Sequence, residues 1–229
     1  MFQRLLDLWR SRDFPDEAFE QALQMLEDCR WMFETVSDAL TGRTEVKNIS
    51  EEIYTRDKEV NRAERDIRSR ILTHLAVHPE TDVPTCLVLM SIVKDIERIG
   101  DYCKNIFEVA ILYKQRLGEE GRYMAPLHDI RTTICQLFTD TAGAIRDSDL
   151  DLAGRVVETG RSVARRCDEL IESLIRDDLP TSKTVAYTLL SRHYKRVGAH
   201  LVNIATSVIN PLDQLDFKAR PKQSPESPS

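Results

Sequence analysis

The chain has 229 residues, of which 41% are hydrophobic and 31% charged, and its formal net charge at pH 7 is −6. This composition is typical of a globular protein with its own core and excludes a fibrous or wholly disordered chain. The balance of 32 Lys and Arg against 38 Asp and Glu argues against a nucleic-acid groove, which needs a basic excess.

Neither a membrane span nor a secretion signal is expected. No apolar run reaches the roughly 18 residues of a membrane span, and Arg4, Asp7 and Arg10 interrupt the first segment. The cysteines are odd in number and never in C-x-x-C spacing, so we expect buried free thiols in a cytoplasmic protein. They are Cys29, Cys86, Cys103, Cys135 and Cys167.

Apolar residues recur at helical spacing along most of the chain, which predicts an all-α fold with six long helices. The expected helices cover residues 16–40, 48–76, 82–117, 126–146, 149–176 and 184–209. Asn48 and Glu51 have the spacing of a capping box at the start of the second helix. Ser148, with Asp151 three residues on, is the expected N-cap of the fifth. Residues 214–229 have no periodicity and are expected to be a disordered tail.

The opening segment, 1–15, is expected to form a short amphipathic helix. Its apolar face and the arginines beside it comprise Phe2, Leu5, Leu6, Trp9, Arg4 and Arg10. Such a face could lie on an anionic membrane surface, or it could dock onto the rest of the protein or onto a partner chain. About ten residues with Asp7 among them are short for a membrane anchor, which favours docking.

Two stretches of the chain match each other. DIERIGDYCKNI covers Asp95–Ile106, and HYKRVGAHLVNI covers His193–Ile204. The matched pairs, each 98 residues apart, are Arg98 with Arg196, Gly100 with Gly198, and Asn105 with Asn203. The match predicts a duplication into units of three helices each, 16–118 and 119–213. A glycine inside a helix costs about 1 kcal/mol relative to Ala, so we expect Gly100 and Gly198 to allow close helix approach.

The first of these stretches resembles the signature of the PhoU family of phosphate-uptake regulators, and RDKEVNRAERDI, Arg56–Ile67, resembles the family's preceding helix. The resemblance implies two tandem three-helix bundles in a cytoplasmic adaptor that damps phosphate uptake by contacting a phosphate transporter or its sensor kinase. It also implies a homodimer with a regulatory role and no enzymatic activity. From the charge balance we expect no nucleic-acid partner, and from the short opening segment at most peripheral membrane contact. The alternatives are a metal-binding helical protein and a companion domain of a sodium-dependent phosphate transporter.

Acidic residues in the first unit are the candidate site. Glu97 and Asp101 are four residues apart, so their carboxylates are neighbours on a helix. They match the E-x-x-x-D motif with which the family binds iron or other metal ions. We expect iron, manganese, zinc or magnesium here, of which iron, manganese and magnesium suit oxygen ligands. Asp57 and Glu64 on the preceding helix could add oxygen ligands.

An ordinary set of surface ion pairs explains the same residues. Lys94, Arg98 and Lys104 border the acidic face and could pair with it. The second unit lacks the motif, because Lys195 and Ala199 stand at the positions of Glu97 and Asp101. Gly160 and Ala164 likewise replace Asp57 and Asn61.

Overall fold

The structure, a computed structural model, describes residues 13–78, 83–113, 117 and 121–210, with side chains from Glu17 onward. Most of the expected opening helix, 1–15, and the expected tail, 214–229, lie outside these ranges. Within them the chain forms helices and no strand, which confirms the all-α prediction. The helices are α2 (Asp13–Thr41), α3 (Val46–Val77), α4 (Val83–Leu112), α5 (Met124–Asp147), α6 (Leu150–Ile175) and α7 (Thr181–Ile209).

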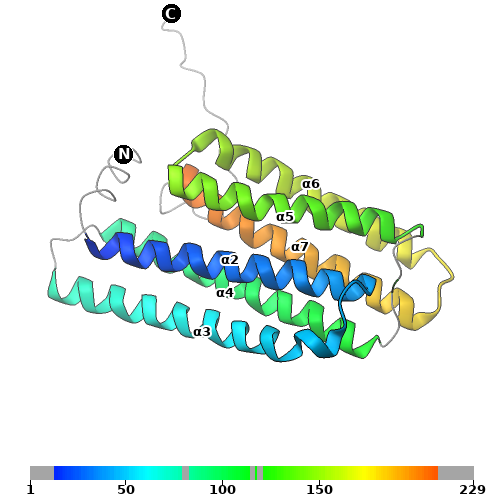
Figure 1. The fold of residues 1–229 in the computed structure, drawn as a ribbon. Helices are drawn as coiled ribbons and strands as arrows, with labels where there is room; N and C mark the ends of the chain where they lie inside the picture. The colour runs from blue at the N-terminus through cyan, green and yellow to red at the C-terminus, as the bar shows by residue number, and fades with distance from the viewer. Residues whose placement is uncertain (1–12, 79–82, 114–116, 118–120, 211–229) are drawn as a thin grey trace, which may run out of the picture.

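The six helices form two three-helix bundles that lie side by side (Figure 1). The first consists of α2, α3 and α4, and the second of α5, α6 and α7. Helices α2 and α4 of the first bundle pack against α5 and α7 of the second, so α3 and α6 lie at the outer edges. The tandem arrangement expected from the repeat is therefore the arrangement observed.

One hydrophobic core runs through both bundles. The Phe33 ring on α2 lies 5.8 Å from that of Phe138 on α5 and 5.1 Å from that of Tyr194 on α7. Tyr194 also donates a hydrogen bond to the Ser37 Oγ at 3.0 Å, which satisfies a polar group in this apolar region. Burial of each such aromatic contributes about 1.5–3 kcal/mol, which favours holding the bundles together.

The free cysteines lie largely in this core. Four of the five are buried, and Cys135 is half-buried. Burial raises the pKa of the Cys135 thiol to about 11, because the thiolate would lose its hydration. The expectation of buried thiols thus holds for four cysteines and in part for the fifth.

Two predicted caps are wrong. Helix α3 starts at Val46, two residues earlier than expected, and its N-cap Glu45 makes no side-chain capping bond, so Asn48 already lies inside the first turn. Ser148 has a left-handed conformation with φ 55° and closes α5. The cap of α6 therefore falls to Asp149, whose carboxylate accepts bonds from the backbone N–H groups of Asp151 and Leu152 at 3.0 and 2.9 Å.

Helix α4 ends at Leu112, five residues before the predicted end at Leu117. Leu117 is nevertheless only 5% exposed, and its N–H donates to the Leu40 carbonyl at 3.3 Å. The predicted helix was too long because Leu117 is a core residue and continues the apolar pattern. It reaches the core from the segment that follows the helix.

Candidate functional site

The four predicted acidic residues come together on the seam between α3 and α4. Asp57 and Glu64 project from α3, and Glu97 and Asp101 from α4; their side chains are 10%, 9%, 12% and 30% exposed. Lysines from α4 join the two helices across this seam. Burial of carboxylates requires such partners, because an unpaired charge is costly to desolvate.

Lys104 bridges two of the carboxylates. Its Nζ lies 3.0 and 3.1 Å from the two oxygens of Asp57 and 3.2 Å from an oxygen of Asp101. Burial by itself lowers the pKa of Lys104, but the hydrogen bonds to Asp57 and Asp101 outweigh burial and the net shift is upward. Lys104 therefore remains an ammonium ion between two carboxylates.

The other two carboxylates pair in the same way. The Lys94 Nζ lies 2.9 Å from Glu97 and 3.9 Å from Glu64. Glu64 also accepts a hydrogen bond from Arg68 at 2.8 Å. Arg98 lies 3.8 Å from Glu97 and 3.5 Å from Asp101. We call these eight residues the α3/α4 ion-pair network: Asp57, Glu64, Arg68, Lys94, Glu97, Arg98, Asp101 and Lys104.

The oxygen donors suit a hard cation, but two ammonium groups occupy the space between them. Over the ranges that the structure describes, no three His, Cys, Asp or Glu side chains converge in a way that could hold a metal ion. The Asn61 side-chain amide, one turn after Asp57, donates to the Asp57 backbone carbonyl at 2.9 Å. In this arrangement the network is satisfied by its own cations, and the metal site stays a prediction.

The second bundle replaces part of this network with close packing. Gly160 stands where the first bundle has Asp57, and Val202 follows Lys104 by 98 residues. A Cβ on Gly160 would overlap the Cγ2 of Val202, so the helices approach closely there. At Gly100 and Gly198 an added Cβ would lie 3.4 and 3.3 Å from its nearest neighbour. The tightest approach is thus at a glycine that the repeat comparison did not single out for packing.

A second polar cluster joins the two bundles where α4 meets α7. The Asp95 Oδ1 lies 2.6 Å from the Nδ1 of His200 and accepts a hydrogen bond from Asn203 at 3.2 Å. Tyr102 stacks on His200 with ring centroids 5.7 Å apart. Asn203 therefore bonds across helices to the first bundle.

Asp95, which is only 8% exposed, was not among the predicted site residues. Asp95 and His193 occupy equivalent positions 98 residues apart, as do Tyr102 and His200. The ring of His193 lies 5.9 Å from that of Tyr102. All four residues therefore lie where α4 meets α7. The sequence carried no local signal of this cluster, because Asp95 and His200 meet only through the packing of α4 on α7.

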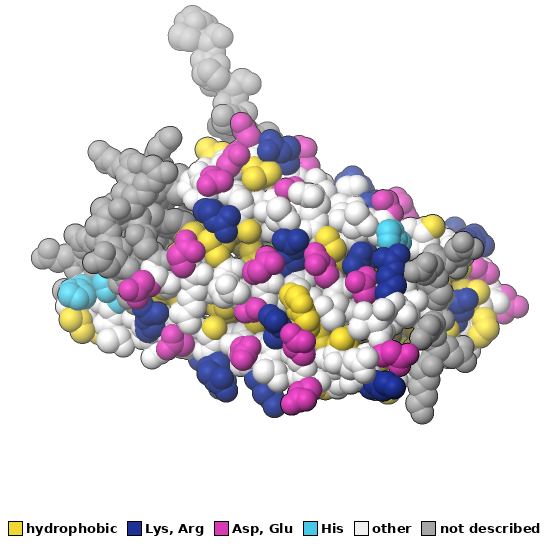
Figure 2. Space-filling view, in the orientation of Figure 1, with side chains coloured by type: hydrophobic (Ala, Val, Ile, Leu, Met, Phe, Trp, Pro, Cys, Tyr) yellow, Lys and Arg dark blue, Asp and Glu magenta, His cyan; other side chains and the backbone are white. Residues whose placement is uncertain are grey.

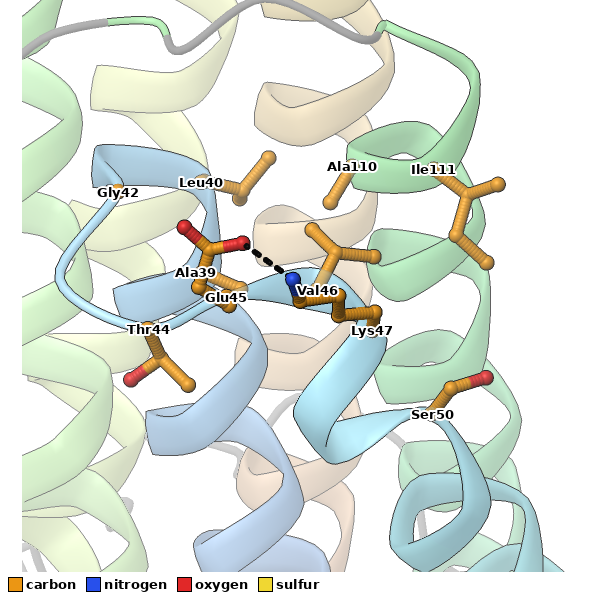
Figure 3. A pocket seen from close by; sticks show the side chains of 10 residues that line it. All are labelled: Ala39, Leu40, Gly42, Thr44, Glu45, Val46, Lys47, Ser50, Ala110 and Ile111. Atoms are coloured by element: carbon orange, nitrogen blue, oxygen red, sulfur yellow. Dashed lines mark ion pairs between the residues drawn. The ribbon is translucent and has the colours of Figure 1, made fainter.

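A pocket of about 530 Å³ lies at one end of the first bundle, between the α2–α3 turn and the end of α4 (Figure 3). Leu40, Val46 and Ile111 are among the apolar side chains that line it. Glu45 and Lys47 form an ion pair of 3.9 Å at its edge. The lining offers apolar contact and a few polar groups, without a paired nucleophile and base.

The surface carries both signs of charge close together. Figure 2 shows Lys and Arg side chains interspersed with Asp and Glu over the face formed by α2 and α3. None of the helices in the described part of the chain has a stretch long and apolar enough to cross a lipid bilayer.

Comparisons with known proteins identify relatives of the whole two-bundle unit. The chain is 26% identical over 181 residues to the phosphate-specific transport system accessory protein PhoU homolog of Pseudomonas putida, an alignment covering 76% of this chain and 70% of the relative. It is also 26% identical over 193 residues to the homolog of Aquifex aeolicus, covering 79% and 86%.

Solved structures show the same fold. PhoU from Pseudomonas aeruginosa superposes with a TM-score of 0.75 at 23% identity, covering 85% of this chain and 94% of that one. The phosphate transport system regulatory protein PhoU from Streptococcus pneumoniae gives 0.70 at 20% identity, covering 86% and 95%.

The family model described as the PhoU domain matches the chain twice, over residues 22–110 and 127–208. The first match lies within α2 to α4 and the second within α5 to α7, so each bundle carries one copy. On these matches, which together cover well over half of its length, the chain belongs to the PhoU family.

Proposed function

We propose that this chain regulates phosphate uptake as a cytoplasmic accessory protein, contacting a phosphate transporter or its sensor kinase and damping transport. Membership of the PhoU family supports the proposal, as do relatives named as accessory proteins of phosphate-specific transport systems. The role is regulatory rather than catalytic, in keeping with the way these relatives are named.

We assign the partner contact to the α3/α4 ion-pair network. The observation that carries this assignment is the difference between the bundles. The seam of the first carries four carboxylates with their cations, whereas the second replaces Asp57 and Lys104 with Gly160 and Val202 and keeps the Lys195–Asp168 pair. Lys94 and Arg98 are 42% and 51% exposed, so they can meet an acidic surface on a partner. Exposed charges of this kind steer association and set its specificity.

The test is complementation of a strain that lacks this protein, with uptake of labelled phosphate measured in phosphate-replete cells. Arg98→Glu should abolish the damping of uptake, whereas Arg196→Glu, at the equivalent exposed position of the second bundle, should preserve it. If both variants damp uptake normally, the assigned surface is wrong. If deleting the protein leaves uptake unchanged, the regulatory function is wrong.

The same assay distinguishes the alternative partner. A companion of a sodium-dependent phosphate transporter should change only the component of uptake that disappears when Na⁺ is replaced by K⁺. An effect on uptake that persists without Na⁺ would exclude that alternative.

A metal-dependent role at the same seam is a second proposal. Four carboxylates from two helices favour it, because three of them are at most 12% exposed and all are oxygen donors. Iron, manganese, zinc and magnesium are the candidates. Elemental analysis of untagged protein beside Glu97→Ala/Asp101→Ala tests this role, since stoichiometric metal must be present and must disappear in the variant.

A further inference from the structure

Charge is divided unequally between two faces of the molecule. Among the four inner helices, α2 packs beside α5 and α4 beside α7, so these pairs form opposite faces. From residue 17 onward α2 carries six Asp and Glu, with Arg30 as its one basic residue. Helix α7 is the reverse, because it has four Lys and Arg and no Asp or Glu between Thr181 and Ile209. In a chain with a net charge of −6, α7 is thus a local basic excess.

The exposed side of α7 is apolar in its first turns and becomes basic further along. Val185 and Leu189 are 51% and 40% exposed, and Arg192, three residues later, is also exposed. Spacings of four and three residues place these side chains on one side of the helix. Lys195 pairs with Asp168 at 2.6 Å, whereas Arg192 has no ion-pair partner in the part of the chain that the structure describes.

The end of α4 adds another apolar side chain beside the start of α7. Leu112, the last residue of α4, is 79% exposed. Burial raises the pKa of Tyr187 on α7, and Tyr113, directly after α4, raises it further, so the two helix ends are adjacent. Exposed aliphatic side chains therefore gather at this end of a basic helix.

We propose that the start of α7 binds the surface of an anionic lipid membrane, with Val185 and Leu189 entering the headgroup region and Arg192 pairing with lipid phosphates. Apolar side chains beside cations are the combination that binds such surfaces. The lack of acidic residues in α7 removes repulsion at the contact. The acidic helix α2, on the opposite face, points away from the lipid.

This inference rests on the proposed function, because a protein that contacts a phosphate transporter acts at a membrane. Arg98, an exposed residue of the proposed partner contact, lies on α4 beside α7. The face that reaches the transporter is then also the face that reaches the lipid. Three aliphatic side chains at one end are few for the apolar core of a protein–protein interface, but they suit shallow insertion between lipids.

The experiment is flotation of the full-length protein with vesicles of phosphatidylglycerol and phosphatidylcholine, beside vesicles of phosphatidylcholine alone. The parent should bind only the anionic vesicles, and less at higher salt, because salt screens the basic contact. Arg192→Glu should lower the partition coefficient about thirtyfold, since it changes the charge at the surface by two. Leu189→Asp should also lower it, by removing an inserting side chain. Arg146→Glu, at an exposed position on α5, is the matched control and should bind like the parent.

Several outcomes would overturn the proposal. The parent could bind neither kind of vesicle, or both equally well. Equal losses for Arg192→Glu and Arg146→Glu would assign the effect to net charge alone. A parent that binds no vesicles, with damping of uptake that Arg192→Glu weakens, would assign the surface to an acidic protein. A parent that damps uptake without binding vesicles keeps the proposed function and excludes the lipid contact. Circular dichroism shows whether each variant keeps its helices.

Discussion

The Cγ2 of Val202 occupies the space that a Cβ on Gly160 would need, so α6 and α7 meet there at backbone distance. The equivalent pair in the first bundle, Lys104 and Asp57, forms an ion pair of 3.0 Å. The equivalent helix pairs of the two bundles are thus held together differently. In the first bundle a largely buried ion pair joins α3 to α4, and in the second α6 packs closely on α7. This exchange shows how the second copy lost the Asp57–Lys104 pair without loss of its fold.

Gly160→Ala should lower the free energy of unfolding by about 1–3 kcal/mol, because the new methyl group overpacks against Val202. Gly154→Ala, on the same helix, is the matched control, since nothing lies within 4 Å of an added Cβ there. That substitution should stabilise the protein by about 0.5–1 kcal/mol through helix propensity. Urea unfolding of both variants measures the difference. Equal changes in the free energy of unfolding for Gly160→Ala and Gly154→Ala would contradict the close approach of the helices. Adding Val202→Ala to Gly160→Ala should restore part of the lost stability, because it removes the overlapping methyl group.

Lys104→Ala should lower the free energy of unfolding by about 2–3 kcal/mol, because it leaves the Asp57 carboxylate largely buried and unpaired. The loss is smaller than for a fully buried pair, since the Lys104 side chain is 24% exposed. Asp57→Ala/Lys104→Val, which imitates the second bundle, should cost less than the single variant because it removes both charges. A double variant less stable than the single one would contradict this account.

The pH dependence of this pair follows from the raised pKa of Lys104. A raised folded-state pKa means that the folded protein holds the proton more tightly than the unfolded chain. The Lys104 ion pairs therefore make their full contribution to the free energy of unfolding below the unfolded-state pKa of about 10.4. That contribution is lost as the pH rises through the pKa of Lys104 in the folded protein. The free energy of unfolding of the parent and of Lys104→Ala should be measured from pH 8 to pH 11. The difference between the two proteins should shrink only at the alkaline end of this range.

Local patterns predicted the helices because helical periodicity depends on residues close in sequence. The duplication was predictable because each of the two matching stretches is continuous in the sequence. Their ends were less predictable, since Ser148 and Asp149 both suit a cap and only the left-handed backbone of Ser148 selects Asp149. Leu117 likewise belongs to the core whether or not the helix reaches it.

The candidate site was predictable in its acidic members and not in its partners. Asp57 and Lys104 are 47 residues apart, and only the packing of α3 on α4 brings them together. The contact between Asp95 and His200 spans both bundles and depends on how the bundles dock. No local pattern carries that information.

His200→Ala should loosen the seam between the bundles, because it removes a partner of the buried Asp95 carboxylate and the ring on which Tyr102 stacks. Asn203 remains as a donor to Asp95, so we expect a loss of about 1–2 kcal/mol rather than unfolding. Hydrogen exchange should quicken along α4 and α7 more than along α3. His128→Ala, at an exposed position on α5, is the control. Uniform quickening across all helices would indicate general destabilisation and contradict a role in joining the bundles.

A metal site at the α3/α4 seam and a seam that holds only ion pairs predict opposite results for one variant, Lys104→Met. The Lys104 ammonium lies within 3.2 Å of both Asp57 and Asp101, where a cation shared by these carboxylates would also lie. Lys104→Met keeps much of the side-chain length and removes the charge. If the seam can hold a divalent ion, this variant should bind Mn²⁺ more tightly than the parent, by about tenfold for each ~1.4 kcal/mol of repulsion removed. Calorimetric titration with Mn²⁺ measures the change, and Lys195→Met in the second bundle is the control. Failure of Lys104→Met to bind Mn²⁺ at all would leave the four carboxylates as partners of lysine and arginine alone.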